Sequence, residues 1–211
     1  MPLTGGGAPA AERQTHRDFL NRYYRATRAV YDATRKYYLF GRDEALRELA
    51  GDTSWRRLVE VGPGTGRNLR SLRRLRPDAV LGGVEASDAM LEHARPRCPG
   101  ISLCQGFAED VDYRSVLGEA PDRILFSYCL SMVQEPERAL DHALDALAPG
   151  GQVWVVDFAD LAGLRGPVKR GLERWLAAFH VAPVALHHLE ARRGELRFGP
   201  LRYWVRARLT P

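Results

Sequence analysis

Lysine, cysteine and long hydrophobic runs are all scarce in this sequence. Lys36 and Lys169 are the only lysines, so arginine carries nearly all of the positive charge behind the formal net charge of +5. The three cysteines, Cys98, Cys104 and Cys129, include no C-x-x-C pair, which argues against a disulfide framework and against a zinc site. No stretch approaches the roughly 18 to 20 apolar residues that a membrane-spanning helix needs.

Targeting and metal-binding patterns are also missing. Residues 1–11 have no basic start followed by an apolar run, so they do not resemble a secretory signal. No two histidines have the H-x-x-x-H spacing of a zinc-ligand pair. We therefore expect a cytoplasmic protein that holds no metal ion.

The chain is long enough for one substantial hydrophobic core. Of its 211 residues, 45% are hydrophobic and 27% are charged, which is ordinary for a globular domain. Residues 1–10 are rich in Gly, Pro and Ala and are expected to be a disordered leader. We expect one domain over residues 11–211, made of an N-terminal helical lid (11–50), a core (56–157) and a C-terminal helix with antiparallel strands (158–211).

Strand-like and helix-like segments alternate along the middle of the chain. Apolar runs of strand length occur at residues 57–61, 80–85, 101–105, 123–128 and 152–157. Helical patterns separate several of them, at residues 68–75, 88–94 and 135–147. This alternation predicts right-handed crossovers and a mostly parallel sheet with helices on both faces, which is a doubly wound Rossmann-like α/β fold.

The pattern changes in the last quarter of the chain. Residues 167–179 have helical spacing. Two extended segments are expected after it, at 185–189 and 202–209, with turns at Gly194 and at Gly199–Pro200 between them. These segments would form an antiparallel end of the sheet and bring the number of strands to seven.

The strongest motif is Val-Glu-Val-Gly-Pro-Gly-Thr-Gly-Arg-Asn at residues 59–68, where the first strand turns into a helix. Glycines there let the backbone approach a ligand closely, and the loop falls at the carboxyl ends of the strands, where doubly wound folds bind ligands. Glu85 ends the second strand, close to the spacing at which an acidic residue meets ribose hydroxyls. The two signals support each other.

Two details favour S-adenosylmethionine over a dinucleotide as the ligand. In the dinucleotide motif G-x-G-x-x-G, the last glycine would stand at position 67, but this chain has Arg67 there and its third glycine at Gly66. Glu60 lies just before the loop, where its negative charge suits an ammonium group better than a diphosphate. A tight turn without a ligand is the remaining alternative.

The motif E-x-G-x-G-x-G, the acidic end of the second strand and the run Leu-Ala-Pro-Gly-Gly at 147–151 together resemble class I S-adenosylmethionine-dependent methyltransferases. The resemblance covers residues 57–157. It implies that the loop glycines line the methionine part of the cofactor, that Glu85 holds the ribose, and that Ala86 and Met90 pack on adenine. From this resemblance, and from the charges of Glu60 and Arg42, we assign these cofactor-binding residues: Arg42, Glu60, Gly62, Gly64, Gly66, Asn68, Glu85, Ala86, Met90, Phe107, Ala108, Glu109 and Ser127.

The adenine end departs from the family pattern. Phe107 stands where such enzymes often carry an Asp that meets the adenine amino group. Adenine recognition would then rely on the Ala108 backbone, with Glu109 as a candidate. By the same resemblance, Ser127 and Tyr128, at the end of the fourth strand, border the cofactor and the methyl acceptor.

Four stretches narrow the resemblance: residues 31–42 (YDATRKYYLFGR), 66–69 (GRNL), 125–132 (LFSYCLSM) and 155–161 (VVDFADL). They are similar to the bacterial betaine-lipid N-methyltransferases, which methylate diacylglyceryl-homoserine to its trimethylated betaine form. The similarity implies a lipid amine as the acceptor and three cofactor molecules for each product.

The chemistry of nitrogen methylation suggests further residues. The amine must be uncharged and held in line with the methyl group, so positioning and desolvation supply much of the rate. Aromatic faces attract the cationic cofactor and product, and Tyr37, Tyr38 and Tyr128 are the candidate positioning residues. Tyr37 and Tyr38 either contact the acceptor from a lid or pack a helix onto the sheet. Arg42 either pairs with a carboxylate or is a surface arginine.

Two arginine-rich segments have two interpretations each. Apolar residues at helical spacing predict an amphipathic helix from about residue 11 to 35, and a short helix follows at 43–50. The basic helix at 13–36 and the segment at 164–179 either lie against anionic lipid headgroups or are ordinary packed or solvated helices.

Other acceptors and other functions stay open at this point. The acceptor is either a lipid or a small molecule, so the nearest rival is a methyltransferase for a soluble amine or hydroxyl. A hypothesis from another functional class is that the protein binds S-adenosylmethionine without catalysing a reaction. We expect no nucleic-acid substrate, since there is no N-P-P-Y-type tetrad after the fourth strand and no appended recognition domain.

Overall fold

The computed structural model describes residues 12, 14–15, 17–18, 21–22, 39–178 and 181–211. The predicted leader, most of the predicted N-terminal helix, and Tyr37 and Tyr38 lie outside the described residues. The described positions between 12 and 22 are helical, as predicted. None of the helices in the described part of the chain is long and apolar enough to cross a membrane.

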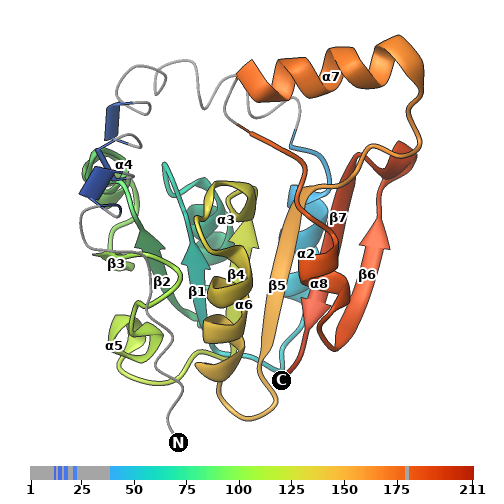
Figure 1. Ribbon diagram of the computed structural model, residues 1–211. Helices are drawn as coiled ribbons and strands as arrows, with labels where there is room; N and C mark the ends of the chain where they lie inside the picture. Colours follow the sequence, from blue (N-terminus) through green and yellow to red (C-terminus); the bar gives the residue numbers. More distant parts are fainter. Residues whose placement is uncertain (1–11, 13, 16, 19–20, 23–38, 179–180) are drawn as a thin grey trace, which may run out of the picture.

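A seven-stranded mixed sheet forms the centre of the molecule (Figure 1). Its strand order is β3-β2-β1-β4-β5-β7-β6. β1 pairs in parallel with β2 and β4, whereas β7 runs antiparallel to both β5 and β6. The strands are β1 (Arg57–Val61), β2 (Val80–Glu85), β3 (Ser102–Gln105), β4 (Arg123–Ser127), β5 (Gln152–Phe158), β6 (Gly194–Phe198) and β7 (Trp204–Leu209). The predicted Rossmann-like fold class is confirmed.

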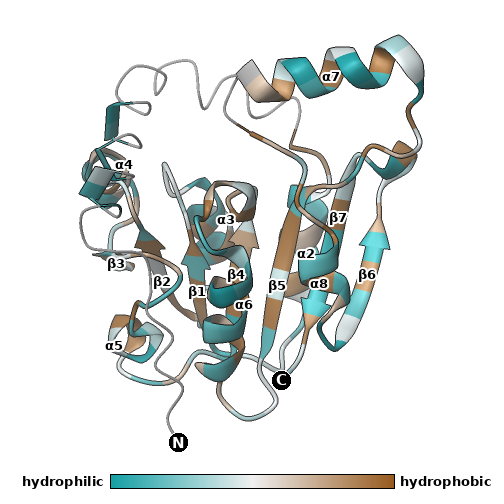
Figure 2. Cartoon of the chain, in the orientation of Figure 1, coloured by the Kyte–Doolittle hydropathy of each residue, from teal (hydrophilic) through white to brown (hydrophobic). Residues whose placement is uncertain are grey.

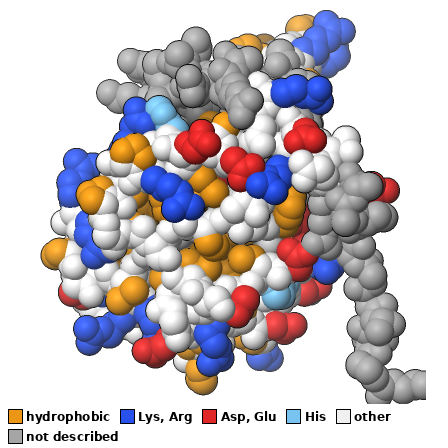
Figure 3. Space-filling model, turned by 90° about the vertical axis from the view of Figure 1, so that its left-hand side faces the viewer, with side chains coloured by type: hydrophobic (Ala, Val, Ile, Leu, Met, Phe, Trp, Pro, Cys, Tyr) orange, Lys and Arg blue, Asp and Glu red, His pale blue; other side chains and the backbone are white. Residues whose placement is uncertain are grey.

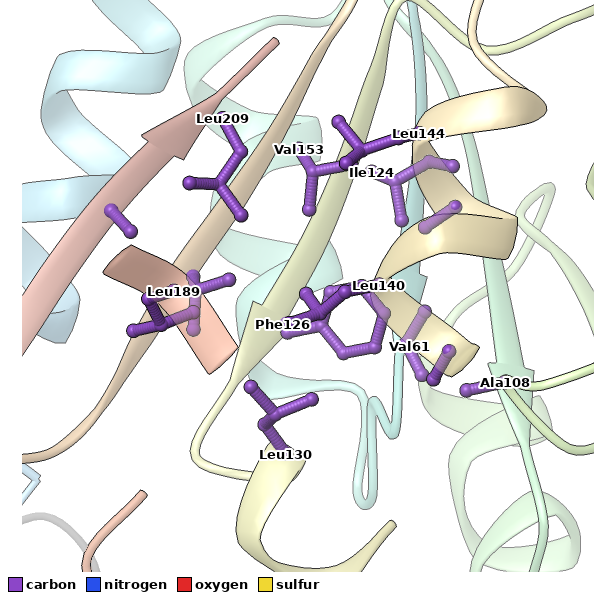
Figure 4. Close-up of a cluster of buried hydrophobic side chains, with 14 of the residues drawn as sticks. Val61, Ala108, Ile124, Phe126, Leu130, Leu140, Leu144, Val153, Leu189 and Leu209 are labelled. Atoms are coloured by element: carbon purple, nitrogen blue, oxygen red, sulfur yellow. The ribbon is translucent and has the colours of Figure 1, made fainter. Parts of the chain in front are cut away.

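Helices cover both faces of this sheet because successive strand residues point to opposite sides. Val59 and Phe126 lie in one buried cluster with residues of α6, and Figure 4 shows Phe126 beside Leu140 of that helix. Leu58 and Leu125 lie in a second cluster with residues of α2 and α3. The α-helices are α2 (Arg42–Gly51), α3 (Arg67–Leu75), α4 (Asp88–Ala94), α5 (Tyr113–Leu117), α6 (Pro136–Asp145), α7 (Gly166–Ala178) and α8 (His187–Glu190).

Hydropathy follows the same division. The central strands are mostly hydrophobic along their length, as expected for strands that are buried on both faces, while the covering helices carry polar residues outside (Figure 2). Three short 3₁₀ turns complete the connections, at Arg95–Arg97, Leu130–Met132 and Pro200–Arg202.

The sequence prediction was wrong in the C-terminal segment. Residues 185–189 were expected to be extended, but His187–Glu190 form the helix α8. Leu186 and Leu189 are three residues apart, so one helical turn places both against the buried cluster under α6. The strand is instead Gly194–Phe198, where a turn was expected at Gly194. It is an exposed edge strand that pairs only with β7, so its sequence lacks a strong hydrophobic pattern.

Candidate cofactor and acceptor site

The glycine loop between β1 and α3 has the backbone conformation that the sequence predicts. Gly62, Gly64 and Gly66 have φ angles of 62°, 55° and 75°, in the left-handed region that favours glycine. A Cβ at Gly62 would lie 2.8 Å from Cys129 Cβ, and one at Gly66 would collide with Cys98 Sγ. Gly64 has open space beside it, so its backbone is the part of the loop that a ligand can approach.

Glu85 ties this loop to the start of α4. Its carboxylate accepts hydrogen bonds from Gly64 N and Ser87 N, both at 3.0 Å. The side chain is buried. Each carboxylate oxygen has a second lone pair, so the two ribose hydroxyls of a nucleoside would find acceptors that are already held in place.

Glu60 and Asn68 form a buried polar pair below the loop. Asn68 Nδ2 donates to Glu60 Oε1 at 2.7 Å. Glu60 is only 1% exposed, and burial raises its pKa to about 7, against the opposing effects of the Asn68 hydrogen bond and the Arg42 charge. Glu60 Oε2 and Asn68 Oδ1 are buried without a hydrogen-bond partner. Because unsatisfied buried polar atoms are costly, this pair fits a ligand with an ammonium group.

Arg42 is not a surface arginine. Its side chain is at the first position of α2 and is 6% exposed. Its Nε lies 3.4 Å from Asp43 Oδ1, and Arg67 donates to the same carboxylate at 3.1 Å. The positive charge of Arg42 partly offsets the rise that burial causes in the pKa of both Glu60 and Tyr128. Arg42 also follows Phe40 by two residues, and the Phe40 backbone O accepts a hydrogen bond from the Tyr128 hydroxyl.

Tyr128, directly after β4, is buried in a strained backbone conformation. Its φ of 54° is in the left-handed region, which is a genuine outlier for a bulky residue and is typical of functional sites. The backbone N donates to Val156 O at 2.8 Å, and the phenol hydroxyl donates to Phe40 O. Burial raises the pKa of Tyr128 far above its ordinary value, so the phenol is neutral over the physiological range.

Four aromatic rings lead from Tyr128 to the surface, and we call them the aromatic row. The ring of Tyr128 meets Phe158 edge-on at 4.8 Å, Phe158 meets Tyr203 at 5.6 Å, and Tyr203 meets Phe40 at 5.4 Å. Phe40 is exposed, whereas Tyr128 and Phe158 are buried. Ser127, the last residue of β4, has a buried Oγ without a hydrogen-bond partner.

The residues predicted for the adenine end follow β2 and β3 and differ in how far they are buried. Met90 and Ala108 are buried, and Ala86 and Phe107 are half-buried. The Glu109 carboxylate accepts a hydrogen bond from Glu135 N at 3.2 Å, at the start of α6. Contact of these residues with adenine stays a prediction.

Sequence reasoning missed one set of contacts at the ribose end. Arg17, in the described part of the N-terminal segment, binds Asp88 with two hydrogen bonds of 2.8 and 2.7 Å. Asn21 Oδ1 accepts from Ser87 Oγ at 2.8 Å and from Ala89 N at 3.3 Å. A helix N-terminus flanked by Ser87 and Asp88 was the only signal for this contact, and it did not reveal the distant partner.

One group in the described part of the chain has metal-ligand chemistry. Ligand atoms of Glu137, His187 and His188 lie within 4.8 Å of one another. His188 Nδ1 lies 2.8 Å from Glu137 Oε1, so the contact joins α8 to α6 as a hydrogen-bonded pair. It involves none of the residues that surround Glu60, Glu85 and Tyr128.

Comparison with known families decides the class of the protein. The model of the methyltransferase domain family matches residues 31–193. The chain belongs to this family. The assignment to the S-adenosylmethionine-dependent methyltransferases, and the choice of S-adenosylmethionine as cofactor, are thereby confirmed.

Individual relatives differ widely in what they methylate. The demethylmenaquinone methyltransferase of Tropheryma whipplei is 28% identical over 154 residues, which is 68% of this chain and 61% of that protein. The match thus spans about three fifths of the relative. The plantazolicin methyltransferase in complex with SAH has a TM-score of 0.68 at 14% identity, over 94% of this chain and 96% of that one. A possible histamine N-methyltransferase of Thermotoga maritima has a TM-score of 0.65 at 22% identity, over 90% and 98%.

Proposed function

We propose that the protein transfers methyl groups from S-adenosylmethionine to the amine of diacylglyceryl-homoserine, or of a closely related amine, at the cytoplasmic face of a membrane. The observation that carries the proposal is the buried Arg42 two residues after Phe40, whose backbone O accepts the hydrogen bond of Tyr128 at the inner end of the aromatic row. The product of exhaustive methylation carries a carboxylate and a quaternary ammonium. Guanidinium binds the first of these groups and aromatic faces attract the second.

The residues of this chain have separate tasks in the proposed reaction. S-adenosylmethionine supplies a methyl group on a positively charged sulfur. Glu60 holds the ammonium of the cofactor's methionine, and Arg42 holds the carboxylate of either the methionine or the acceptor. Glu85 binds the ribose hydroxyls. This places the amino-acid end of the cofactor at the inner end of the aromatic row.

Nitrogen methylation needs an amine with a free lone pair. The lone pair forms the new nitrogen–carbon bond while the carbon–sulfur bond breaks, and its electrons stay on sulfur. Tyr128 cannot act as a phenolate base because it is neutral, but its hydroxyl oxygen can accept a hydrogen bond from the amine while the hydroxyl donates its own hydrogen bond to Phe40 O. In this proposal the amine enters deprotonated, and the products of the first and second transfers each lose one proton to water. The third transfer gives the quaternary ammonium, which has no proton to release.

Mass spectrometry after incubation with S-adenosylmethionine tests this function. One sample contains diacylglyceryl-homoserine dispersed in detergent, and a parallel sample contains homoserine and a panel of soluble amines and alcohols. We expect mass gains of one to three methyl groups on the lipid. Methylation confined to a soluble compound would refute the lipid acceptor, and cofactor binding without turnover on any acceptor would indicate a non-catalytic protein.

A further inference from the structure

Four of the exposed large hydrophobic side chains in the described residues lie in the segment before α2 or in the C-terminal part of the chain: Phe40, Val168, Trp175 and Leu201. The other two, Leu75 and Val80, lie at the turn between α3 and β2. Phe40 also belongs, with Tyr203, to the aromatic row on the acceptor side of the site.

α7 lies above the sheet (Figure 1), and hydrophilic and hydrophobic residues alternate along it (Figure 2). Of its leucines, Leu176 is buried and Leu172 is half-buried, whereas Val168 is 65% and Trp175 is 38% exposed. At about 100° per residue, Val168 and Trp175 lie within about 20° of each other, and they are about 80 to 100° around the helix from Leu176. Figure 3 views the opposite side of the molecule, where β3, α4 and α5 lie, and shows basic, acidic and hydrophobic side chains interspersed over that face.

α7 and Arg165, the residue before it, carry mostly positive charge, and little of that charge is paired among the described residues. Lys169 contacts Asp160 O at 3.0 Å and the Glu173 carboxylate at 3.8 Å. Within the described part of the chain, no acidic side chain forms an ion pair with Arg165, Arg170 or Arg174, all three of which are exposed. Arg170 and Arg174 are four residues apart and therefore lie on the same side of the helix. At about 100° per residue they are about 120 to 160° from Leu176, so the arginines and the Val168–Trp175 pair form the two flanks of the outward half of α7.

A strained loop holds a third apolar side chain outward beside the start of α7. Leu201 and Arg202 have φ angles of 55° and 51°, a conformation that costs energy in any residue with a side chain. The backbone is fastened there, because Gly163 N donates to Leu201 O at 3.2 Å and Arg202 binds Asp160 with two hydrogen bonds. Leu201 is nevertheless 58% exposed, so the strain does not serve core packing.

We propose that α7 and the Leu201 loop form a docking surface for an anionic lipid bilayer. Val168, Trp175 and Leu201 enter the headgroup region, and Arg165, Arg170 and Arg174 contact lipid phosphates. Tryptophan and arginine flanking a small apolar surface are the features of helices that lie in the membrane interface. Charge complementarity selects an anionic membrane as the occupant.

Docking in this orientation would bring the acceptor side of the site to the lipid. Leu161 precedes α7 and Leu176 belongs to it. Both pack in one buried cluster with Tyr128 and Phe158. A bilayer held by α7 therefore lies over the elements that line the acceptor end. This inference rests on the proposed function, because only a lipid acceptor requires such access.

Vesicle sedimentation of the full chain tests the docking surface. The vesicles contain phosphatidylcholine alone or with 30% phosphatidylglycerol, as a stated anionic composition. We expect binding to the anionic vesicles only, and a blue shift of the fluorescence that Trp175→Phe removes. In the double variant Arg170→Glu with Arg174→Glu, affinity should fall at least about 25-fold, taking roughly 5-fold for each arginine lost.

Two control variants match these changes elsewhere on the surface. Arg47→Glu with Arg74→Glu produces the same change of net charge on α2 and α3, where both arginines are exposed. Leu75→Ser with Val80→Ser is the control for Val168→Ser with Leu201→Ser, since all four side chains are exposed. We expect the controls to bind anionic vesicles within about twofold of the wild type. Equal losses in control and test variants would overturn the proposal.

A methylation assay separates this inference from the proposed function. If the α7 variants lose vesicle binding and vesicle methylation but keep activity on detergent-dispersed lipid, both proposals are supported. If the wild type methylates dispersed lipid and ignores anionic vesicles, the docking surface is refuted and the function stands. If it binds vesicles through α7 but methylates only soluble amines, the lipid acceptor is refuted. Retention on heparin without vesicle binding would indicate another polyanion as the partner and overturn the docking proposal.

Discussion

The buried carboxylate of Glu60 should make the ligand-free protein less stable at neutral pH than a neutral variant. Glu60 is 1% exposed, its Oε2 has no hydrogen-bond partner, and its pKa is raised by burial from 4.5 to about 7. The substitution Glu60→Gln keeps the shape of the side chain and the acceptor for Asn68 Nδ2. It removes the charge that burial disfavours.

The size and sign of the effect follow from the two pKa values. The pKa of Glu60 is about 7 in the folded protein and 4.5 in the unfolded chain, so folding favours the protonated carboxyl. The resulting stabilisation is complete below pH 4.5 and is lost as the pH rises through about 7. The difference corresponds to about 3 kcal/mol. At pH 8 the Glu60→Gln variant should therefore melt about 6 to 12 °C above the wild type, and at pH 4.5 the two should melt together.

Thermal unfolding followed by circular dichroism between pH 4.5 and 8 measures this difference, with the exposed Glu92→Gln as the control. The same variant should bind S-adenosylmethionine at least about tenfold more weakly in calorimetry, because the ammonium of the methionine loses its charged partner. A melting-temperature difference that does not change with pH would refute the assignment of the buried charge. Unchanged cofactor affinity would refute the ammonium contact.

Four other substitutions test the rest of the site. Glu85→Ala should abolish cofactor binding in calorimetry with the circular dichroism spectrum kept, and normal affinity would remove the ribose assignment. Tyr38→Ala should slow methyl transfer more than it weakens cofactor binding, and full activity would place that side chain in the core. Arg17→Ala and Asp88→Ala should be non-additive by about 0.5 to 1 kcal/mol in urea unfolding, because the pair is partly exposed. Tyr128→Phe should keep methyl transfer within a few-fold, and a hundredfold loss would show that the hydroxyl takes part in proton transfer.

Local patterns in the sequence were enough to predict the architecture and the cofactor loop. Apolar runs and helical spacing located the five central strands because each lies in a buried parallel sheet, where hydrophobicity is continuous. The glycines at 62, 64 and 66 were informative because only glycine adopts the left-handed backbone at no steric cost. Glu85 followed from its distance along the chain to that loop.

The C-terminal region shows where local patterns stop being decisive. Residues 185–189 (Ala-Leu-His-His-Leu) have apolar residues at both ends and were expected to be extended, yet Leu186 and Leu189 form a helical turn because a buried cluster under α6 receives them. The edge strand β6 is held by backbone hydrogen bonds to β7. Such bonds depend on a distant partner and leave little trace in the composition of the strand itself.

By itself the sequence determined the fold class, the cofactor and the order of the site residues, since each depends on backbone conformation or on spacing along one segment. Only the tertiary structure decided that Arg42 is buried, that the Tyr128 hydroxyl binds Phe40 O, that Arg17 pairs with Asp88, and that α7 leaves Val168 and Trp175 exposed. The physical reason is that burial, pKa and ion pairing depend on groups that are far apart in the chain and meet only in the folded protein.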